Sequence, residues 1–149
     1  LSLVNRFAGS TIYPYSVAAH SVYVSMLVPL RCAKQALMHD AQEAYIGDVT
    51  SPLKKALPDY QRIEAVFSDV IADKFGLDRI MDPEVKIADR IAYATERELL
   101  LTPTACATAK VEDDKSNKMV GVEPHPMPLP LSWIDPEQLF LLRYRELFL

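Results

Sequence analysis

Hydrophobic residues recur at helical spacing along most of the chain, at intervals of three and four positions. The first such segment follows Ser16, a residue suited to capping a helix, and ends at Pro29. The second covers 31–45 and is followed by Gly47, which is suited to the position after a helix. We therefore expect both segments to form helices.

Four further segments show the same spacing. Pro52 suits the first turn of a short helix, and Gly76 suits the end of a longer one. In the longer segment the hydrophobic residues form a stripe of Ile63, Val66, Phe67, Val70, Ile71 and Phe75. In the segment that Pro83 opens, the residues expected to face inward are Val85, Ala88, Ile91, Ala92 and Leu99. The expected bounds of the four helices are about 52–57, 63–75, 83–101 and 136–148.

The region 102–133 lacks this pattern. It carries several prolines and the polar run EDDKSNK, both of which are typical of irregular structure. We expect a long Pro-rich loop there. The only candidates for strand-like structure are extended pieces at 118–123. The sequence thus predicts an all-α fold, a single compact orthogonal bundle of about six helices that spans 1–149 as one domain.

Composition narrows the class of protein. The chain has 149 residues, 16 Lys and Arg against 20 Asp and Glu, and a formal net charge of −4. The hydrophobic share of 50% excludes a wholly disordered chain. Mild acidity without a basic stripe argues against a nucleic-acid polymer as partner. It is compatible with a single nucleotide whose charge is neutralised by a metal and a few basic side chains.

Cysteine usage and hydropathy favour a cytoplasmic protein without a membrane partner. Cys32 and Cys106 are far apart in the sequence and do not make a disulfide framework. No uninterrupted apolar run approaches the roughly 20 residues needed to cross a bilayer. The N-terminal LSLVNRFAGST lacks the apolar core of a signal peptide. Because the chain starts with Leu1 rather than Met, we also expect that a short leading segment is missing.

Polar residues interrupt the apolar sides of three expected helices. His20 lies among valines, and Asp89 lies in the apolar string KIADRIA. His39 and Asp40 directly follow a run of apolar residues. Two imidazoles and two carboxylates suit a divalent ion such as Mn, Co, Fe or Zn, and less exclusively Mg. A single His or Asp at such a position is more often a core residue or a cap, but burying the adjacent pair without a partner is costly.

Three strings in the chain resemble a known family. They are AAHSVYVSML, ALMHDAQEAYIGDVTSPLKK and VKIADRIAYATERELL. Together they are similar to the H…HD…D signature of the HD-domain metal-dependent phosphohydrolases. HDAQEAYIGDVTSPLK resembles more narrowly the bacterial 5′-deoxynucleotidases and their phage relatives, which show HDAxE, then GD, then a Ser/Thr-Pro-x-Lys element. The resemblance covers Asn5 to Leu101 and implies an HD-domain helical bundle.

The resemblance also implies a metal site and two acidic residues beside it. The residues that match the four metal ligands are His20, His39, Asp40 and Asp89. The implied cofactor is a divalent metal, Co, Mn, Zn or Mg. Glu43 shares the helix face of Asp40 and matches the residue that activates or orients the attacking water, or protonates the leaving oxygen. Asp48 matches a second acidic residue that positions water or contacts the substrate.

Substrate contacts follow from the same resemblance. Lys54 matches the basic residue that meets phosphate. Arg6 and Phe7 resemble an Arg-aromatic pair whose Arg meets phosphate or sugar and whose ring packs against the nucleoside. The spacing from this pair to the first ligand His differs from the family's by one residue. Ile12 and Tyr13 are further candidates for packing against a base.

Each of these residues also has a plain structural interpretation. The alternatives for the motif residues are a solvated helix position for Glu43, a turn cap for Asp48 and surface positions for Lys54 and Lys55. Arg90 is expected either to pair with an acidic motif residue (Glu43 or Asp48) or to touch phosphate. Glu96 and Arg97 are expected to staple helices together, and His125 is expected on the surface.

The implied activity is metal-dependent hydrolysis of deoxynucleotide phosphate esters. The favoured substrate is a dNTP, with dATP first, which phage relatives split into deoxynucleoside and triphosphate. One alternative is a 5′-deoxynucleotidase that acts on dNMPs. Another is a non-catalytic module that binds metal and nucleotide, against which the presence of Glu43, Asp48 and Lys54 counts. The GDVTSPLK string argues against hydrolysis of ppGpp or cyclic nucleotides, and a di-iron oxygenase would need more histidines.

The expected partners are a small-molecule deoxynucleotide and, from the resemblance, further copies of the same chain. The cytoplasm in question would be that of the host if the protein is phage-encoded. The apolar residues of the last helix are Leu139, Phe140, Leu142, Leu147 and Phe148. They could form a surface between copies, but we expect them to belong to the core.

Overall fold

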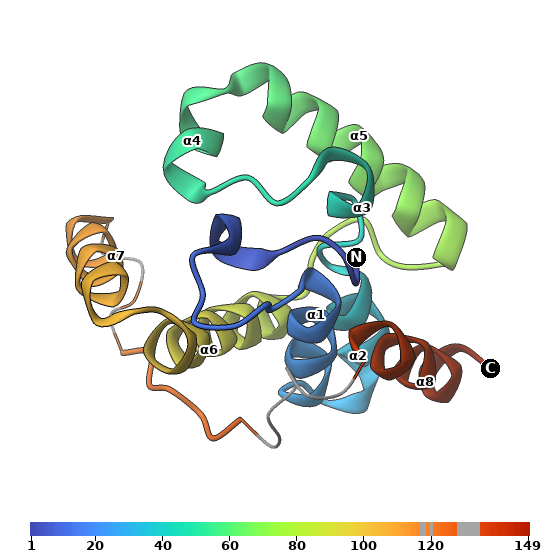
Figure 1. Ribbon diagram of the computed structural model, residues 1–149. Helices are drawn as coiled ribbons and strands as arrows, with labels where there is room; N and C mark the ends of the chain where they lie inside the picture. The colour runs from blue at the N-terminus through green and yellow to red at the C-terminus, as the bar shows by residue number, and fades with distance from the viewer. Residues whose placement is uncertain (117–118, 120, 128–134) are drawn as a thin grey trace.

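The structure, a computed structural model, describes residues 1–116, 119, 121–127 and 135–149 (Figure 1). Its elements are η1 (Arg6–Gly9), α1 (Val17–Met26), α2 (Leu30–Met38), α3 (Glu43–Ile46), α4 (Ser51–Ala56), α5 (Pro58–Phe75), α6 (Pro83–Leu100), α7 (Pro103–Ser116) and α8 (Pro136–Phe148). The described residues form no strand, so the prediction of an all-α fold is confirmed. They form more α-helices than the six expected, because two regions differ from the prediction.

Helix α1 lies between its neighbours and is buried on all sides. Ser16 caps it by accepting a hydrogen bond from the backbone N–H of Ala19, at 3.2 Å. Residues 17–25 are all buried, and the helix contacts α2, α6 and α8 (Figure 1). Valine and alanine dominate this stretch, as in helices that are hydrophobic all round. This central position carries His20 into the interior.

The expected single helix over 31–45 is wrong, because the chain leaves the helix after Met38. Residues 39–42 form turns, with short-range bonds such as Glu43 N–H to Asp40 C=O at 3.0 Å. These i→i−3 bonds have nearly the same spacing as a helix, so the hydrophobic pattern does not reveal the break. Helix α3 then ends at Gly47, whose φ of 78° and ψ of 162° suit only glycine.

Helices α4 and α5 form an arm that reaches away from α1 and α2 (Figure 1). Helix α4 begins at Ser51, one residue before the expected start, and α5 ends at the left-handed Gly76 as predicted. Only the end of the expected apolar stripe of α5 is buried, at Ile71. The remainder of the stripe includes three exposed side chains, Ile63, Val66 and Val70, with 50%, 63% and 59% of their surface accessible.

Helix α6 packs against α1 and α2 through small side chains. Asp82 caps it by accepting from the backbone N–H of Glu84, and Val85, Ala88 and Ala92 are buried. The expectation that Leu99 faces inward is wrong, because 52% of its side chain is exposed. The spacing of the buried positions continues to Leu100 instead.

The expected loop over 102–133 is wrong for its first half, which forms α7. Pro103 stands at the first helical position, where proline is tolerated, and the following residues carry no further proline until Pro124. Residues 121–127 are irregular as expected, and the described part of 118–123 forms no strand. The rest of the predicted loop, including 128–133, lies outside the described residues.

Helix α8 begins after Asp135, which accepts from the backbone N–H of Glu137, and ends at Phe148 as predicted. Its apolar residues belong mainly to the core, as expected. Leu147 is buried against α1 and α2, and Phe140 and Tyr144 pack beside it. Leu142 is exposed.

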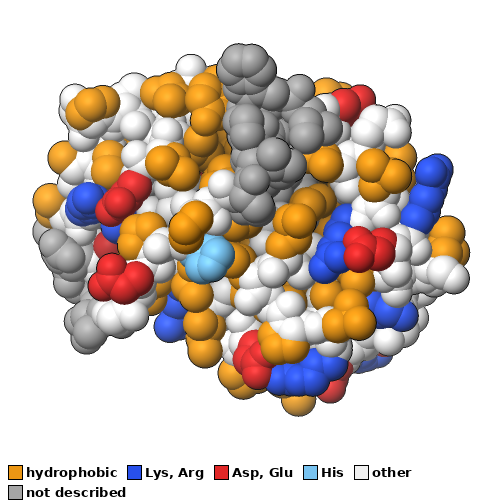
Figure 2. Space-filling view, turned by 90° about the horizontal axis from the view of Figure 1, so that it is seen from below, with side chains coloured by type: hydrophobic (Ala, Val, Ile, Leu, Met, Phe, Trp, Pro, Cys, Tyr) orange, Lys and Arg blue, Asp and Glu red, His pale blue; other side chains and the backbone are white. Residues whose placement is uncertain are grey.

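Figure 2 shows one face of the molecule, on which hydrophobic side chains lie among Lys, Arg, Asp and Glu, with charges of both signs. Within the described part of the chain, no helix combines the length and hydrophobicity needed to span a membrane.

Candidate metal centre and pocket

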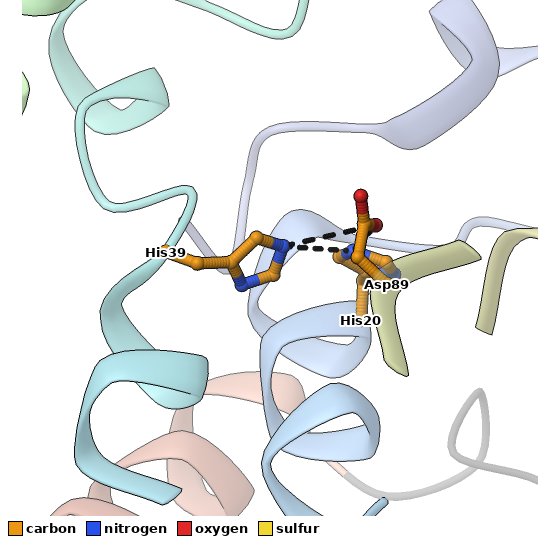
Figure 3. A group of neighbouring side chains, drawn as sticks. All are labelled: His20, His39 and Asp89. Atoms are coloured by element: carbon orange, nitrogen blue, oxygen red, sulfur yellow. Dashed lines mark hydrogen bonds and ion pairs between the residues drawn. The ribbon is translucent and has the colours of Figure 1, made fainter. Parts of the chain in front are cut away.

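Three predicted ligands meet between α1, the end of α2 and α6 (Figure 3). His20 Nε2 lies 3.3 Å from His39 Nε2 and 3.2 Å from Asp89 Oδ1. The fourth predicted ligand, Asp40, borders this group, with Oδ2 at 3.2 Å from His39 Nε2 and 3.6 Å from His20 Nε2. The structure therefore brings all four residues together.

The outer nitrogens of both histidines are held by acceptors. His20 Nδ1 contacts a carboxylate oxygen of Glu96 at 2.6 Å, and His39 Nδ1 contacts the backbone oxygen of Ala36 at 2.7 Å. In the neutral rings each Nδ1 therefore carries the hydrogen, and each Nε2 directs a lone pair at the centre of the group. Two such lone pairs lie beside the carboxylates of Asp89 and Asp40, and this arrangement favours either a bound cation or protonated histidine rings.

The donor set and its spacing fit a divalent metal. Two neighbouring ligands, each at about 2.1 Å from one ion and at right angles, lie about 3.0 Å apart. The contacts of His20 Nε2 with His39 and Asp89, at 3.3 and 3.2 Å, are close to that separation. Mixed imidazole and carboxylate ligands suit Mn, Co, Fe or Zn, so these residues could hold such an ion.

Electrostatics at the group favour positive charge. Burial lowers the pKa of His39, but Asp40 and Asp89 outweigh burial and raise that pKa to about 9. Burial raises the pKa of Asp89, but its bond with His20 and the charge of His39 lower it overall. The histidines thus gain a proton readily when no metal is present, because the carboxylates attract any cation.

Glu96 is the site residue that sequence analysis missed. It is fully buried and accepts hydrogen bonds from Tyr15 Oη at 2.8 Å and Arg6 Nε at 3.1 Å, besides contacting His20. The expectation that Glu96 connects helices does not include its contact with His20, a predicted metal ligand. Its position seven residues after Asp89, two turns along the same face, was the available signal.

Glu43 lies inside the protein, so the alternative of a solvated position is wrong. Only 4% of its surface is exposed, and within the described part of the chain its Oε2 has no hydrogen-bond partner. Burial, with Asp40 and Asp48 nearby, raises the pKa of Glu43 to about 9. Its carboxyl group is therefore protonated at neutral pH, which is the state of a proton donor.

Asp48 follows the turn at Gly47 and faces the same region as Glu43. Burial raises the pKa of Asp48, Arg6 opposes this and Asp40 adds to it, and the net shift is upward. The alternative role of a turn cap has no support, because no backbone N–H in the described residues donates to Asp48.

A cavity of about 520 Å³ opens beside the metal group. Its lining includes seven of the predicted site residues, namely Arg6, Phe7, Asp40, Glu43, Asp48, Lys54 and Asp89. His20 and His39 do not belong to the lining. The volume falls within the range of about 300–1,000 Å³ that is typical of ligand pockets.

Arg6 and Phe7 reach the cavity through an unusual turn. Phe7 and Ala8 have positive φ angles of 54° and 50°, a left-handed conformation that costs a side-chain-bearing residue about 1–2 kcal/mol. Arg6 contacts Glu96 and also Asp40 Oδ2, at 3.6 Å, so carboxylates already compensate its charge. The ring of Phe7 stacks on that of Tyr93, with centroids 5.8 Å apart.

The cations around the cavity differ in how they are paired. Lys54 Nζ contacts Glu64 Oε1 at 2.5 Å and lies over the ring of Tyr60. By contrast, three exposed cations in the lining show no acidic partner among the described residues: Lys55, Lys86 and Arg90. The expected pairing of Arg90 with Glu43 or Asp48 does not form within that part of the chain.

The remaining residues from the sequence analysis lie elsewhere. Ile12 is exposed and Tyr13 packs against the core, and neither lines the cavity. His125 is exposed as expected, and its backbone binds Thr95. Arg97 staples α6 to α7 as expected, through Asp113 at 2.6 Å.

Similar proteins have no stated function. No known family model matches the chain. The chain is 53% identical over 147 residues to the uncharacterized protein YfdR of Escherichia coli strain K12, a match that covers 99% of this chain and 79% of YfdR. It is 32% identical over 102 residues to an uncharacterized protein of Rhodobacter capsulatus, covering 62% of this chain and 52% of that protein. The chemistry therefore has to be inferred from the residues.

Proposed function

We propose that this chain, which belongs to the same family as YfdR of Escherichia coli, is a divalent-metal-dependent phosphohydrolase of the HD-domain kind. One observation carries the proposal. His20 Nε2, His39 Nε2 and an Asp89 oxygen lie within 4.8 Å of one another, and Asp40 Oδ2 borders them at 3.2 Å from His39 Nε2. Beside them lies a buried carboxyl group, that of Glu43, whose Oε2 has no hydrogen-bond partner in the described residues. A bound metal and a proton carrier together can promote hydrolysis of a phosphate ester.

The residues of the site have different proposed roles: some would hold the metal, and others would transfer protons. When bound, the metal would supply a water molecule of lowered pKa and polarise a phosphoryl oxygen. Glu43 holds a proton within the cavity and is suited to pass it to the leaving oxygen. Asp48 faces the same cavity, and its raised pKa suits it to accept a proton. Glu96 keeps the ring of His20 oriented.

The favoured substrate is a deoxynucleoside triphosphate, with dATP first. The three cations without an acidic partner among the described residues, Lys55, Lys86 and Arg90, line the same cavity as Glu43. A triphosphate offers them more negative charges than there are cations, whereas a monophosphate carries only about −1.5 to −2 and would leave at least one of the three uncompensated. This charge balance favours dNTPs over the alternative dNMPs. Assembly with further copies of the chain stays a prediction, for which Ile63, Val66 and Val70 of α5 offer an exposed apolar surface.

Product analysis tests the proposal directly. The protein is incubated with Mn²⁺, Co²⁺ or Mg²⁺ and with each dNMP and dNTP, and the products are separated. Deoxyadenosine and triphosphate from dATP would support the favoured substrate, and deoxynucleoside with orthophosphate would support the nucleotidase. Metal binding with no turnover of any nucleotide would leave a non-catalytic binding module and overturn the proposal.

Variants separate the metal site from the proton carrier. Asp40→Asn and His39→Ala are expected to abolish metal-dependent turnover. Glu43→Gln should keep metal and substrate binding but lower kcat by about 100- to 10,000-fold, the range for loss of a general acid. Glu98→Gln, on the exposed side of α6, is the matched control and should leave kcat unchanged. An unchanged kcat in Glu43→Gln would remove Glu43 from the chemistry.

A further inference from the structure

Helix α5 exposes a row of apolar side chains along most of its length. The helix has 18 residues and lies at the edge of the molecule, where its last turns pack against the core (Figure 1). Ile63, Val66 and Val70 follow one another at intervals of three and four residues, so they lie on one side of the helix. Between 50% and 63% of the surface of each is accessible. A row of exposed apolar side chains on one side of a helix favours an interaction surface.

Two aromatic rings widen this row. Phe67 is partly exposed and stacks on Tyr45, with ring centroids 5.2 Å apart and an interplanar angle of 16°. Tyr45 belongs to α3 and is 70% exposed. The stack therefore extends the apolar surface of α5 towards the segment that carries Glu43 and Asp48.

Six positions on this side of α5 are arranged symmetrically about the middle of the helix. They form three pairs, and the members of each pair lie at equal distances from the midpoint of Pro58–Phe75. At about 100° per residue, all six lie within about 50° of one line along the helix, and together they form what we call the α5 face. The pairs are Asp59 with Lys74, Ile63 with Val70, and Val66 with Phe67.

The charged residues at the two ends of the α5 face are available for an external contact. Lys74 is exposed and shows no acidic partner in the described part of the chain. Asp59 pairs with Arg62 of its own helix, and the two side chains are 83% and 79% exposed. An exposed pair of this kind contributes little to stability, so Asp59 can exchange it for another cation at little cost.

We propose that the α5 face is the interface between two copies of this chain, which pack α5 against α5 in antiparallel orientation about a two-fold axis at the middle of the helix. A two-fold interface is self-complementary, because each contact occurs twice with the roles of the copies exchanged. In this register Ile63 of one copy meets Val70 of the other, and Asp59 meets Lys74 at both ends. The expectation of further copies specified neither a surface nor a register, and the α5 face supplies both.

The order of charges selects the antiparallel orientation. In a parallel pair of helices, Asp59 would lie beside Asp59 and Lys74 beside Lys74, and like charges repel. In the antiparallel pair each end joins opposite charges, while the apolar residues meet apolar residues in the middle. Charge and hydrophobicity therefore favour the same arrangement.

The metal group does not depend on the α5 face. Its ligands come from α1, the end of α2 and α6, whereas α5 joins the body of the protein through its last turns. Variants that separate the copies should therefore keep their Mn²⁺ affinity. Failure of the interface is thus distinguishable from failure of the proposed function.

Analytical ultracentrifugation of the full chain across a dilution series measures the pairing. Val66→Glu places a charge in the apolar centre of the interface and should weaken the dimer at least about 10-fold. Leu99→Glu, at a residue of α6 that is 52% exposed, is the matched control and should leave the dimerisation constant unchanged. Circular dichroism shows whether each variant keeps its helices. A wild-type chain that stays monomeric across the series, or a Val66→Glu chain that pairs as tightly as wild type, would overturn the interface.

Exchange of the two charges tests the register. Asp59→Lys and Lys74→Asp each replace two opposite-charge contacts with two like-charge contacts, and each should weaken the dimer about 3- to 30-fold at low salt. High salt should reduce this loss. The double variant restores opposite charges at the same places and should pair nearly as tightly as wild type. A double variant as weak as the single variants, or single variants that pair like wild type, would overturn the antiparallel arrangement.

Discussion

At Glu43, burial and two neighbouring carboxylates act together against ionisation. The pKa of the folded protein, about 9, lies above the ordinary value of 4.5. The stability that this group contributes is therefore fully present below pH 4.5 and is lost as the pH rises to about 9. At neutral pH the metal-free folded protein is therefore destabilised by the residue that we propose as the proton donor.

Glu43→Gln is accordingly expected to stabilise the metal-free protein while it removes activity. The gain should be about 3–5 kcal/mol at pH 8, because an amide needs no proton to remain neutral when buried. Near pH 4.5 the two proteins should be equally stable. Urea unfolding at both pH values, in the presence of EDTA, measures the difference. A variant that is less stable than wild type at pH 8 would contradict the raised pKa.

Glu96→Gln tests whether this buried carboxylate positions His20. The amide can still accept from the ring, but the negative charge that orients the His20 N–H and increases its basicity is gone. Mn²⁺ affinity is expected to fall about 10- to 100-fold, as for other residues that support a metal ligand. Tyr15→Phe removes a donor to the same carboxylate without touching the ring, and should lower the affinity much less. Calorimetric titration gives both values, and equal losses would favour a purely structural role.

The sequence predicted the place of individual site residues where those residues belong to a motif. His20, His39 and Asp89 meet as the resemblance implies, because the spacing of polar residues on apolar faces survives folding. Glu96 was interpreted only as a residue that connects helices, because nothing in the charged string TERE indicates a contact with a buried histidine. The pairing of Lys54 with Glu64 depends on how α4 meets α5, which no local pattern encodes.

At the scale of elements, the decisive feature is the interruption between α2 and α3. Residues 39–42 form turns with i→i−3 bonds, and His39 Nε2 and Asp40 Oδ2 lie 3.2 Å apart at this interruption. Gly47 then reverses the chain and delivers Asp48 to the cavity. Short interruptions of this kind leave the hydrophobic period intact, so the sequence pattern predicted one helix. Helix α7 was missed for another reason, because the prolines that marked its region as a loop lie at its start and beyond its end.

Gly47→Ala is expected to destabilise the protein and to lower its activity. A Cβ at this position meets no atom within 4 Å, so the effect comes from the backbone alone. The φ and ψ angles of Gly47 are nearly exclusive to glycine, and the cost should be about 1–3 kcal/mol. Gly76→Ala, in the milder left-handed region at the end of α5, should cost about 1 kcal/mol and keep kcat. The two variants are compared by their unfolding free energies and their kcat. An equal kcat in both would show that the position of Asp48 does not matter for catalysis.

For the whole molecule, the proposed metal would join three helices that otherwise meet through small side chains. Mn²⁺ at 100 times its Kd should add about 2.7 kcal/mol of stability, which for a chain of this size raises Tm by about 5–11 °C. His39→Ala should lose the shift, and Lys110→Ala, on the exposed side of α7, should keep it. Thermal unfolding with and without the metal measures this. An equal shift in His39→Ala would place the metal elsewhere.

The hydrophobic periodicity predicted the all-α class, but it did not predict how the arm of α4 and α5 is arranged. The sequence pattern predicts that the apolar stripe of α5 belongs to the core. Only the last turns of α5 reach α8, however, so three residues of the stripe are exposed: Ile63, Val66 and Val70. A pattern of apolar positions shows which face of a helix avoids water. It does not show whether the residues that pack on this face belong to the same chain.

The spread of the ligands along the chain has a consequence for the order of folding. His20, His39 and Asp89 are drawn from positions separated by up to 69 residues, and the carboxylate arrives only when α6 docks on α1 and α2. Closing so long a loop is slow relative to forming the helices themselves. Metal would then bind after the folding barrier has been crossed, so that it slows unfolding and leaves the folding rate nearly unchanged.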